Sequence, residues 1–199
     1  MKTKSHEKQL LISCGILRPE IETLIARGDI DVDAIFLNKY LHMDYGKLHD
    51  ALKSSLHRHR GKSPVVVYGD VCLGFKSEMQ TLLSEFDAVK IDALNCIDAL
   101  LGGRGQLLEI DPKHRFFFLT PAFIEFSETL ISGTKAENRH RFNMLEGIIL
   151  VDSLGDMERH QDRIDHFSDQ TGLPVMEHRK VGLHGLKNLI AEALPRRRP

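Results

Sequence analysis

The feature that most constrains this chain is an apolar run that leads into a cysteine between two glycines. Three valines and a tyrosine, residues 65–68, are followed by a loop that contains Cys72. Such a run indicates a buried strand, and the glycines indicate a tight loop after it. Two further predicted strands lead into Cys14 and Cys96 in the same way. Because the chain has three cysteines in all, every thiol follows a predicted strand.

Strands and amphipathic helices alternate along the sequence, which predicts an α/β fold with a mostly parallel open sheet and helices on both faces. These are Rossmann-like layers, although no nucleotide-binding glycine fingerprint occurs. The length suits a single domain, 1–199, with frayed ends at 1–9 and 195–199. Two polar stretches, 104–113 and 132–142, are predicted to be loops. The predicted strands cover residues 10–14, 34–38, 65–68, 88–91, 115–119, 147–152 and 173–176.

Composition excludes several classes of function. The net charge of -1 gives no field that would attract nucleic acid or an anionic membrane. No apolar run is long enough to span a bilayer or to form a signal peptide. We therefore predict a cytoplasmic protein without nucleic-acid or membrane partners, and a homodimer as the default assembly. An odd number of cysteines in a reducing compartment points to metal binding or thiol chemistry rather than disulfides.

Parallel strands end at one edge of their sheet, so we expect Cys14, Cys72 and Cys96 to meet there. Cys96 follows Asn95, a good N-cap, and a helix N-terminus favours the thiolate that a metal requires. The loops around the other two thiols are expected to do the same. Three thiolates suit an iron–sulfur cluster or zinc better than magnesium or calcium. The competing interpretation is that each cysteine is a small buried hydrophobe.

Other polar residues near strand ends are weaker candidates. Asp70 and Asp152 are candidate ligands, bases or catalytic carboxylates, whereas Asp98 is expected to be a helix cap or turn residue. His178 and His184 flank a turn from which they could reach the sheet edge. The remaining histidines that we considered are expected to lie on the solvated surface; they are His57, His59, His140, His160 and His166.

Four short motifs suggest a relationship: CGIL at 14–17, YGDVC at 68–72, CIDALLGG at 96–103 and FLTP at 118–121. With them the chain resembles an uncharacterised domain-of-unknown-function family of methanogenic archaea and anaerobic bacteria, often encoded near corrinoid-dependent methyltransferases. The resemblance covers roughly residues 14–131 and is weak in the C-terminal third.

The resemblance implies that the three cysteines occupy positions common in that family. It also implies that a His-Asp pair often precedes the last cysteine, where this chain has Leu94 and Asn95. An anaerobic setting favours an iron–sulfur cluster over zinc. The family offers no established reaction.

The leading prediction is a metal-binding protein that holds a four-iron four-sulfur cluster through Cys14, Cys72 and Cys96. One iron would be left open for a small-molecule ligand in anaerobic methyl or one-carbon metabolism, and zinc is the second choice of metal. Two alternatives stay open. One is a metal-free thiol enzyme with Cys72 or Cys96 as nucleophile. The other is a non-catalytic accessory protein of a corrinoid methyltransferase. The sequence does not decide whether the protein is an enzyme.

Overall fold

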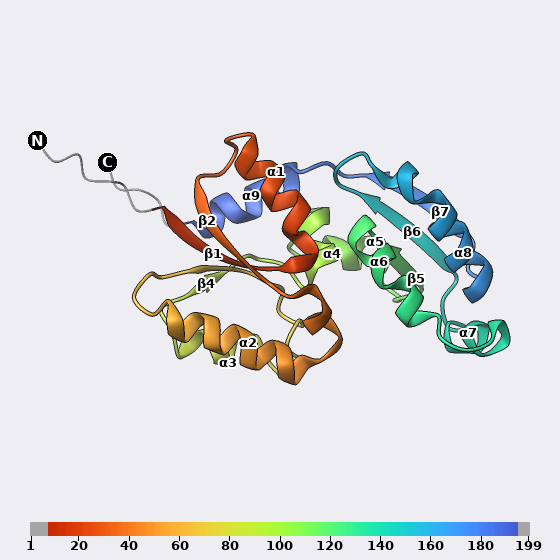
Figure 1. Ribbon diagram of the computed structural model, residues 1–199, viewed down its shortest axis with the longest axis horizontal. Coiled ribbons are helices and arrows are strands. Elements are labelled where there is room, and N and C mark those ends of the chain that lie inside the picture. The colour runs from red at the N-terminus through yellow and green to blue at the C-terminus, as the bar shows by residue number, and fades with distance from the viewer. Residues whose placement is uncertain (1–7, 195–199) are drawn as a thin grey trace, which may run out of the picture.

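Parallel strands form two separate sheets in the computed structural model, which describes residues 8–194 (Figure 1). The predicted frayed ends were 1–9 and 195–199. Residues 1–7 and 195–199 lie outside the described residues, whereas Gln9 already belongs to a strand. The first sheet has the order β2-β1-β3-β4 and the second the order β5-β6-β7. The strands are β1 (Gln9–Cys14), β2 (Val32–Leu37), β3 (Val65–Val67), β4 (Val89–Lys90), β5 (Phe116–Leu119), β6 (Gly147–Asp152) and β7 (Val175–Lys180).

Both sheets contain interior strands that pair in parallel on both sides, among them β3 between β1 and β4. β1 pairs with β2 and β3, and β6 pairs with β5 and β7. All six residues of β6 and five of the six in β1 are buried. This burial explains why both strands are continuous apolar runs rather than alternating ones. The predicted α/β class with parallel strands is confirmed, and the division into two sheets is an additional finding.

Helices connect the parallel strands and cover the sheets. Figure 1 shows α1 and α9 on one side of the first sheet and α2 and α3 on the other. The last helix, α9, follows β7 yet returns to the first sheet, where Leu186 and Leu189 join its core. The helices are α1 (Arg18–Ala26), α2 (Tyr45–Arg58), α3 (Glu78–Ser84), α4 (Cys96–Leu101), α5 (Gln106–Ile110), α6 (Pro121–Leu130), α7 (Lys135–Arg141), α8 (Gln161–Thr171) and α9 (His184–Ala193), with 3-10 turns η1 (Gly15–Leu17), η2 (Lys39–Met43) and η3 (Met157–His160).

Two stretches predicted to be loops contain helices, so those predictions are wrong. Residues 104–113 include α5, and 132–142 include α7. The α7 helix begins at a capping box in which Thr134 and Glu137 each accept a backbone N–H of the other. Such a box satisfies N–H groups that a helix start leaves without partners, which lets a polar segment form a helix.

Within the part of the chain that is described, no helix combines the length and the hydrophobicity needed to cross a membrane.

Candidate functional site

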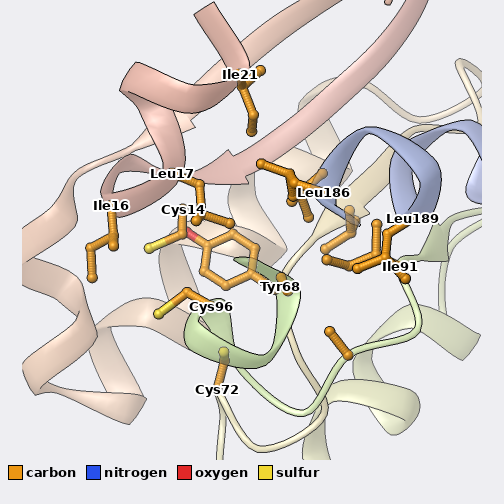
Figure 2. Close-up of a cluster of buried hydrophobic side chains, with 14 of the residues drawn as sticks. Cys14, Ile16, Leu17, Ile21, Tyr68, Cys72, Ile91, Cys96, Leu186 and Leu189 are labelled. Carbon is orange, nitrogen blue, oxygen red and sulfur yellow. The ribbon is translucent and has the colours of Figure 1, made fainter. Parts of the chain in front are cut away.

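The three thiols lie in one buried cluster beside the ring of Tyr68 (Figure 2). Cys14 is the last residue of β1, Cys72 lies in the loop after β3, and Cys96 is the first residue of α4. Their exposed fractions are 4%, 7% and 5%. A thiolate on Cys14 would raise the pKa of both other thiols, which shows that the three groups are electrostatic neighbours.

Two loops that carry thiols are fastened to each other by backbone contacts. The N–H of Asp70 donates to Ala93 O at 3.0 Å, and that of Val71 donates to Leu94 O at 3.0 Å. A Cβ on Gly69 would lie 2.2 Å from the carbonyl carbon of Leu94, so only glycine allows this approach. The YGDVC motif therefore sets the position of its cysteine relative to the loop that leads to α4.

Close backbone packing also explains the glycine that follows Cys14. A Cβ on Gly15 would lie 2.5 Å from the carbonyl oxygen of Leu37, the last residue of β2. The chain can therefore turn sharply into η1 at the end of β1 while it stays in contact with the neighbouring strand. This turn holds Cys14 at the carboxyl edge of the sheet.

Asp98 organises the loop around Cys96. Its buried carboxylate accepts the N–H groups of Leu94 at 2.9 Å and Leu107 at 2.9 Å, and that of Gly105 at 3.2 Å. Asn95 caps α4 by accepting the N–H of Asp98 at 2.9 Å. The expectation that Asp98 is a structural residue is confirmed, and so is the N-cap.

Burial governs the protonation of the thiols. It raises the pKa of Cys72 to about 12, although the N–H of Gly69 donates to its sulfur at 3.3 Å. It also raises the pKa of Cys14 and of Cys96, and nearby backbone N–H groups offset only part of this effect. The expectation that these positions favour the thiolate is therefore wrong for thiols without a bound cation. Loss of hydration outweighs the helix N-terminus.

Tyr68 is a candidate that sequence reasoning missed. Its side chain is 3% exposed, and its hydroxyl has no hydrogen-bond partner of acceptable geometry among residues 8–194. Figure 2 shows that hydroxyl turned towards Cys14. Burial and the three neighbouring thiols raise the pKa of this phenol, so it is a proton donor rather than a phenolate. A tyrosine at the end of a run of valines was the available signal.

The candidate carboxylates and histidines have other contacts. Asp70 accepts from Gln80 and lies 3.1 Å from the Lys90 ammonium, while Asp152 lies 3.3 Å from His178. Asp152 also accepts the N–H groups that close the turn after β6. Within residues 8–194, no three His, Cys, Asp or Glu side chains stand where they could hold a single metal ion. His184 is exposed. Of the predicted surface histidines, three are exposed, namely His57, His140 and His166, and two are half-buried, namely His59 and His160.

A cleft of about 620 Å³ opens at the carboxyl edges of both sheets. Its wall includes Gly15 after β1, Leu37 at the end of β2, Pro121 after β5 and Leu154 after β6. Ligands of parallel α/β proteins bind outside this edge of the sheet. Gly15 directly follows Cys14, so the cleft and the thiol cluster are adjacent along the chain.

Comparison with known proteins identifies a family. The profile of the family described as Protein of unknown function (DUF1638) matches residues 36–190. The chain belongs to this family. The DUF1638 match includes Cys72 and Cys96 but begins after Cys14, and it extends through the C-terminal third. Its limits therefore differ at both ends from the expected 14–131. No curated protein and no solved structure matches the chain.

Proposed function

We propose that Cys14, Cys72 and Cys96 bind a four-iron four-sulfur cluster in which one iron has no cysteine ligand. The observation that supports this proposal is the gathering, in one buried cluster, of thiols from the end of β1, the loop after β3 and the start of α4. Buried cysteines that pack only as hydrophobes need not share a location. Cysteine thiolates are the usual ligands of such clusters.

A cluster and a zinc ion require different spacings of their sulfur ligands. A single zinc ion needs its sulfurs within one coordination shell, at about 2.3 Å from the metal. In a four-iron cluster each thiolate binds a different iron, so the sulfurs stay apart by the width of the cluster. The three thiols are electrostatic neighbours without forming a single-ion site among the described residues. Zinc stays the second candidate because the anaerobic setting implied by the resemblance favours a cluster.

Tyr68 supports the same assignment. Its buried hydroxyl lies beside the Cys14 thiol but makes no well-directed hydrogen bond within the described part of the chain, and a buried donor without such a bond costs about 1–3 kcal/mol. A cluster beside the ring would offer sulfur atoms that accept a hydrogen bond. The thiols would lose their protons when they bind iron, since a metal at the site reverses the effect of burial on their pKa.

The ligand of the open iron and the pathway are proposed only in outline. The open iron would bind a small molecule, and the earlier resemblance suggests anaerobic methyl or one-carbon metabolism in the cytoplasm. The role of a metal-free thiol enzyme is weakened because burial raises the pKa of Cys72 and Cys96, whereas an activated nucleophile needs a lowered one. No observation favours an accessory protein of a corrinoid methyltransferase.

Purification without oxygen, followed by reconstitution with iron and sulfide, tests the proposal. We expect a brown protein that absorbs broadly near about 400 nm and carries iron and sulfide in equal amounts. Replacement of any one cysteine by serine should lower the iron content severalfold. The control is Ser13→Ala, a buried change next to Cys14, which should leave iron content unchanged. Protein with neither iron nor zinc would refute the proposal.

A further inference from the structure

Two carboxylate oxygens of residues that line the cleft are shielded from water and accept no hydrogen bond from residues 8–194. Glu20 is 3% exposed, and its Oε1 accepts the hydroxyl of Ser153 at 2.6 Å. Its Oε2 has no hydrogen-bond partner among residues 8–194, and neither has Oδ1 of Asp156. Both residues line the cleft. Buried carboxylate oxygens are nearly always paired, so this pair indicates that a donor is missing.

The other charges of the cleft limit what this donor is. Lys39 is paired with Glu125, and Arg18 is paired with Glu22 outside the cleft at 2.7 Å. Arg159 also lines the cleft and has no acidic partner within the described residues. Among the charged cleft residues that the structure describes, these pairs leave two neighbouring carboxyls, Glu20 and Asp156, and the guanidinium of Arg159. A ligand with both a cationic and an anionic group complements these charges.

We propose that the cleft binds a small zwitterion, such as an amino acid or a dipeptide. Its ammonium group donates hydrogen bonds to Glu20 Oε2 and Asp156 Oδ1, and its anionic group pairs with Arg159. An ammonium has three donors, which suits two acceptors on neighbouring carboxyls. The volume of about 620 Å³ lies within the usual range for small-molecule sites. Both acceptor oxygens are shielded from water, so binding includes a rotation of the Glu20 and Asp156 carboxyls towards the ligand.

The competing explanation is that Glu20 and Asp156 share a proton and bind nothing. Burial raises the pKa of Glu20, and the charge of Asp156 adds to this shift. A shared proton would partner these carboxyls without any ligand. If Glu20 and Asp156 share a proton, the cleft does not prefer an amine over its uncharged analogue. Binding experiments therefore separate the two explanations.

Calorimetric titration of the full chain, without any metal, tests the proposal. The probes are the twenty amino acids, their dipeptides with glycine, and the analogue of each hit that lacks the amino group. We expect at least one hit with a dissociation constant below about 1 mM. The analogue should bind at least tenfold more weakly. No hit among the probes, or an analogue that binds as tightly as its amine, overturns the proposal.

Three variants test whether the amino acid or dipeptide that binds does so at Glu20 and Asp156. Glu20→Gln and Asp156→Asn remove one charge each with little change of shape, and each should weaken binding at least tenfold. The control is Glu158→Gln, because Glu158 is an exposed carboxylate of the same turn as Arg159 but is not among the residues that line the cleft; the affinity of this variant should stay within twofold of wild type. Equal affinity in all variants places the hit elsewhere and overturns the proposal. Because no cysteine takes part, failure of the cluster proposal leaves this result unaffected.

Discussion

Tyr68 allows the cluster proposal to be tested without a change to any thiol. In the metal-free protein, Tyr68→Phe removes a buried hydroxyl whose neighbour is the Cys14 thiol, a weak acceptor, and which makes no well-directed hydrogen bond among residues 8–194, so it should stabilise the fold by about 1–3 kcal/mol. After reconstitution the gain should disappear, because the hydroxyl then donates to the cluster. Urea unfolding of both forms measures the difference.

Tyr45→Phe is the matched control for this comparison. Tyr45 is 49% exposed, so its free energy of unfolding should change by less than about 0.5 kcal/mol in either form. An equal gain from Tyr68→Phe with and without iron would mean that the hydroxyl contacts no bound group.

Glu20 gives a pH dependence with a definite sign. Burial, reinforced by Asp156, raises its pKa above the unfolded value. The folded state therefore binds this proton more tightly, and Glu20 lowers stability at every pH above its folded pKa. Glu20→Gln should stabilise the protein at pH 7–8 by about 1–3 kcal/mol. The gain should shrink as the pH falls through the folded pKa towards about 4.3, the usual value of an unfolded glutamate.

Thermal unfolding between pH 5 and 8 measures this effect. Glu22→Gln is the control, because Glu22 is an exposed residue of the same helix and is paired with Arg18. Its effect should stay below about 0.5 kcal/mol. A gain from Glu20→Gln that does not depend on pH would show that the charge of Glu20 is not the cause.

At the scale of elements, the contact between the loops after β3 and β4 fixes two of the three thiols. Gly69→Ala places a methyl group where the Leu94 backbone lies, so the loops must separate. We expect a loss of about 2–4 kcal/mol and a severalfold loss of bound iron. Gly46→Ala is the control. Gly46 lies in the first turn of α2, and a Cβ there would lie 3.5 Å from Oδ1 of the N-cap residue Asp44, an ordinary contact. There alanine should stabilise by about 0.5–1 kcal/mol. An undisturbed iron content in Gly69→Ala would contradict the role given to this contact.

Most elements could be predicted from the sequence because their apolar faces are local patterns. The runs that became β1, β3 and β6 are buried along almost their whole length, and buried runs are visible without a structure. The α7 helix was missed because KAENRHR has no apolar stripe. The sequence nevertheless indicated the start of α7, because Thr134 is followed three residues later by Glu137, the pattern of a capping box.

At the scale of the whole molecule, strand pairing could not be predicted, because periodicity says which segments are strands but not which of them are neighbours. The return of α9 to the first sheet follows from packing between distant residues, such as Leu189 against Gly103. The same limit applies to the site. The sequence indicated the three cysteines, but the burial that reverses their expected pKa shifts arises from the complete fold. The unpartnered oxygens of Tyr68 and Glu20 arise in the same way.

If the three thiols bind a cluster as proposed, their burial limits when that cluster can be inserted. With at most 7% of any cysteine exposed, iron has little direct access to the sulfurs in this structure. Delivery would then take place during synthesis or early refolding, or after local unfolding of the loop that carries Cys72. Insertion into the folded protein would then proceed at the rate of that unfolding, and an excess of iron and sulfide would not accelerate it.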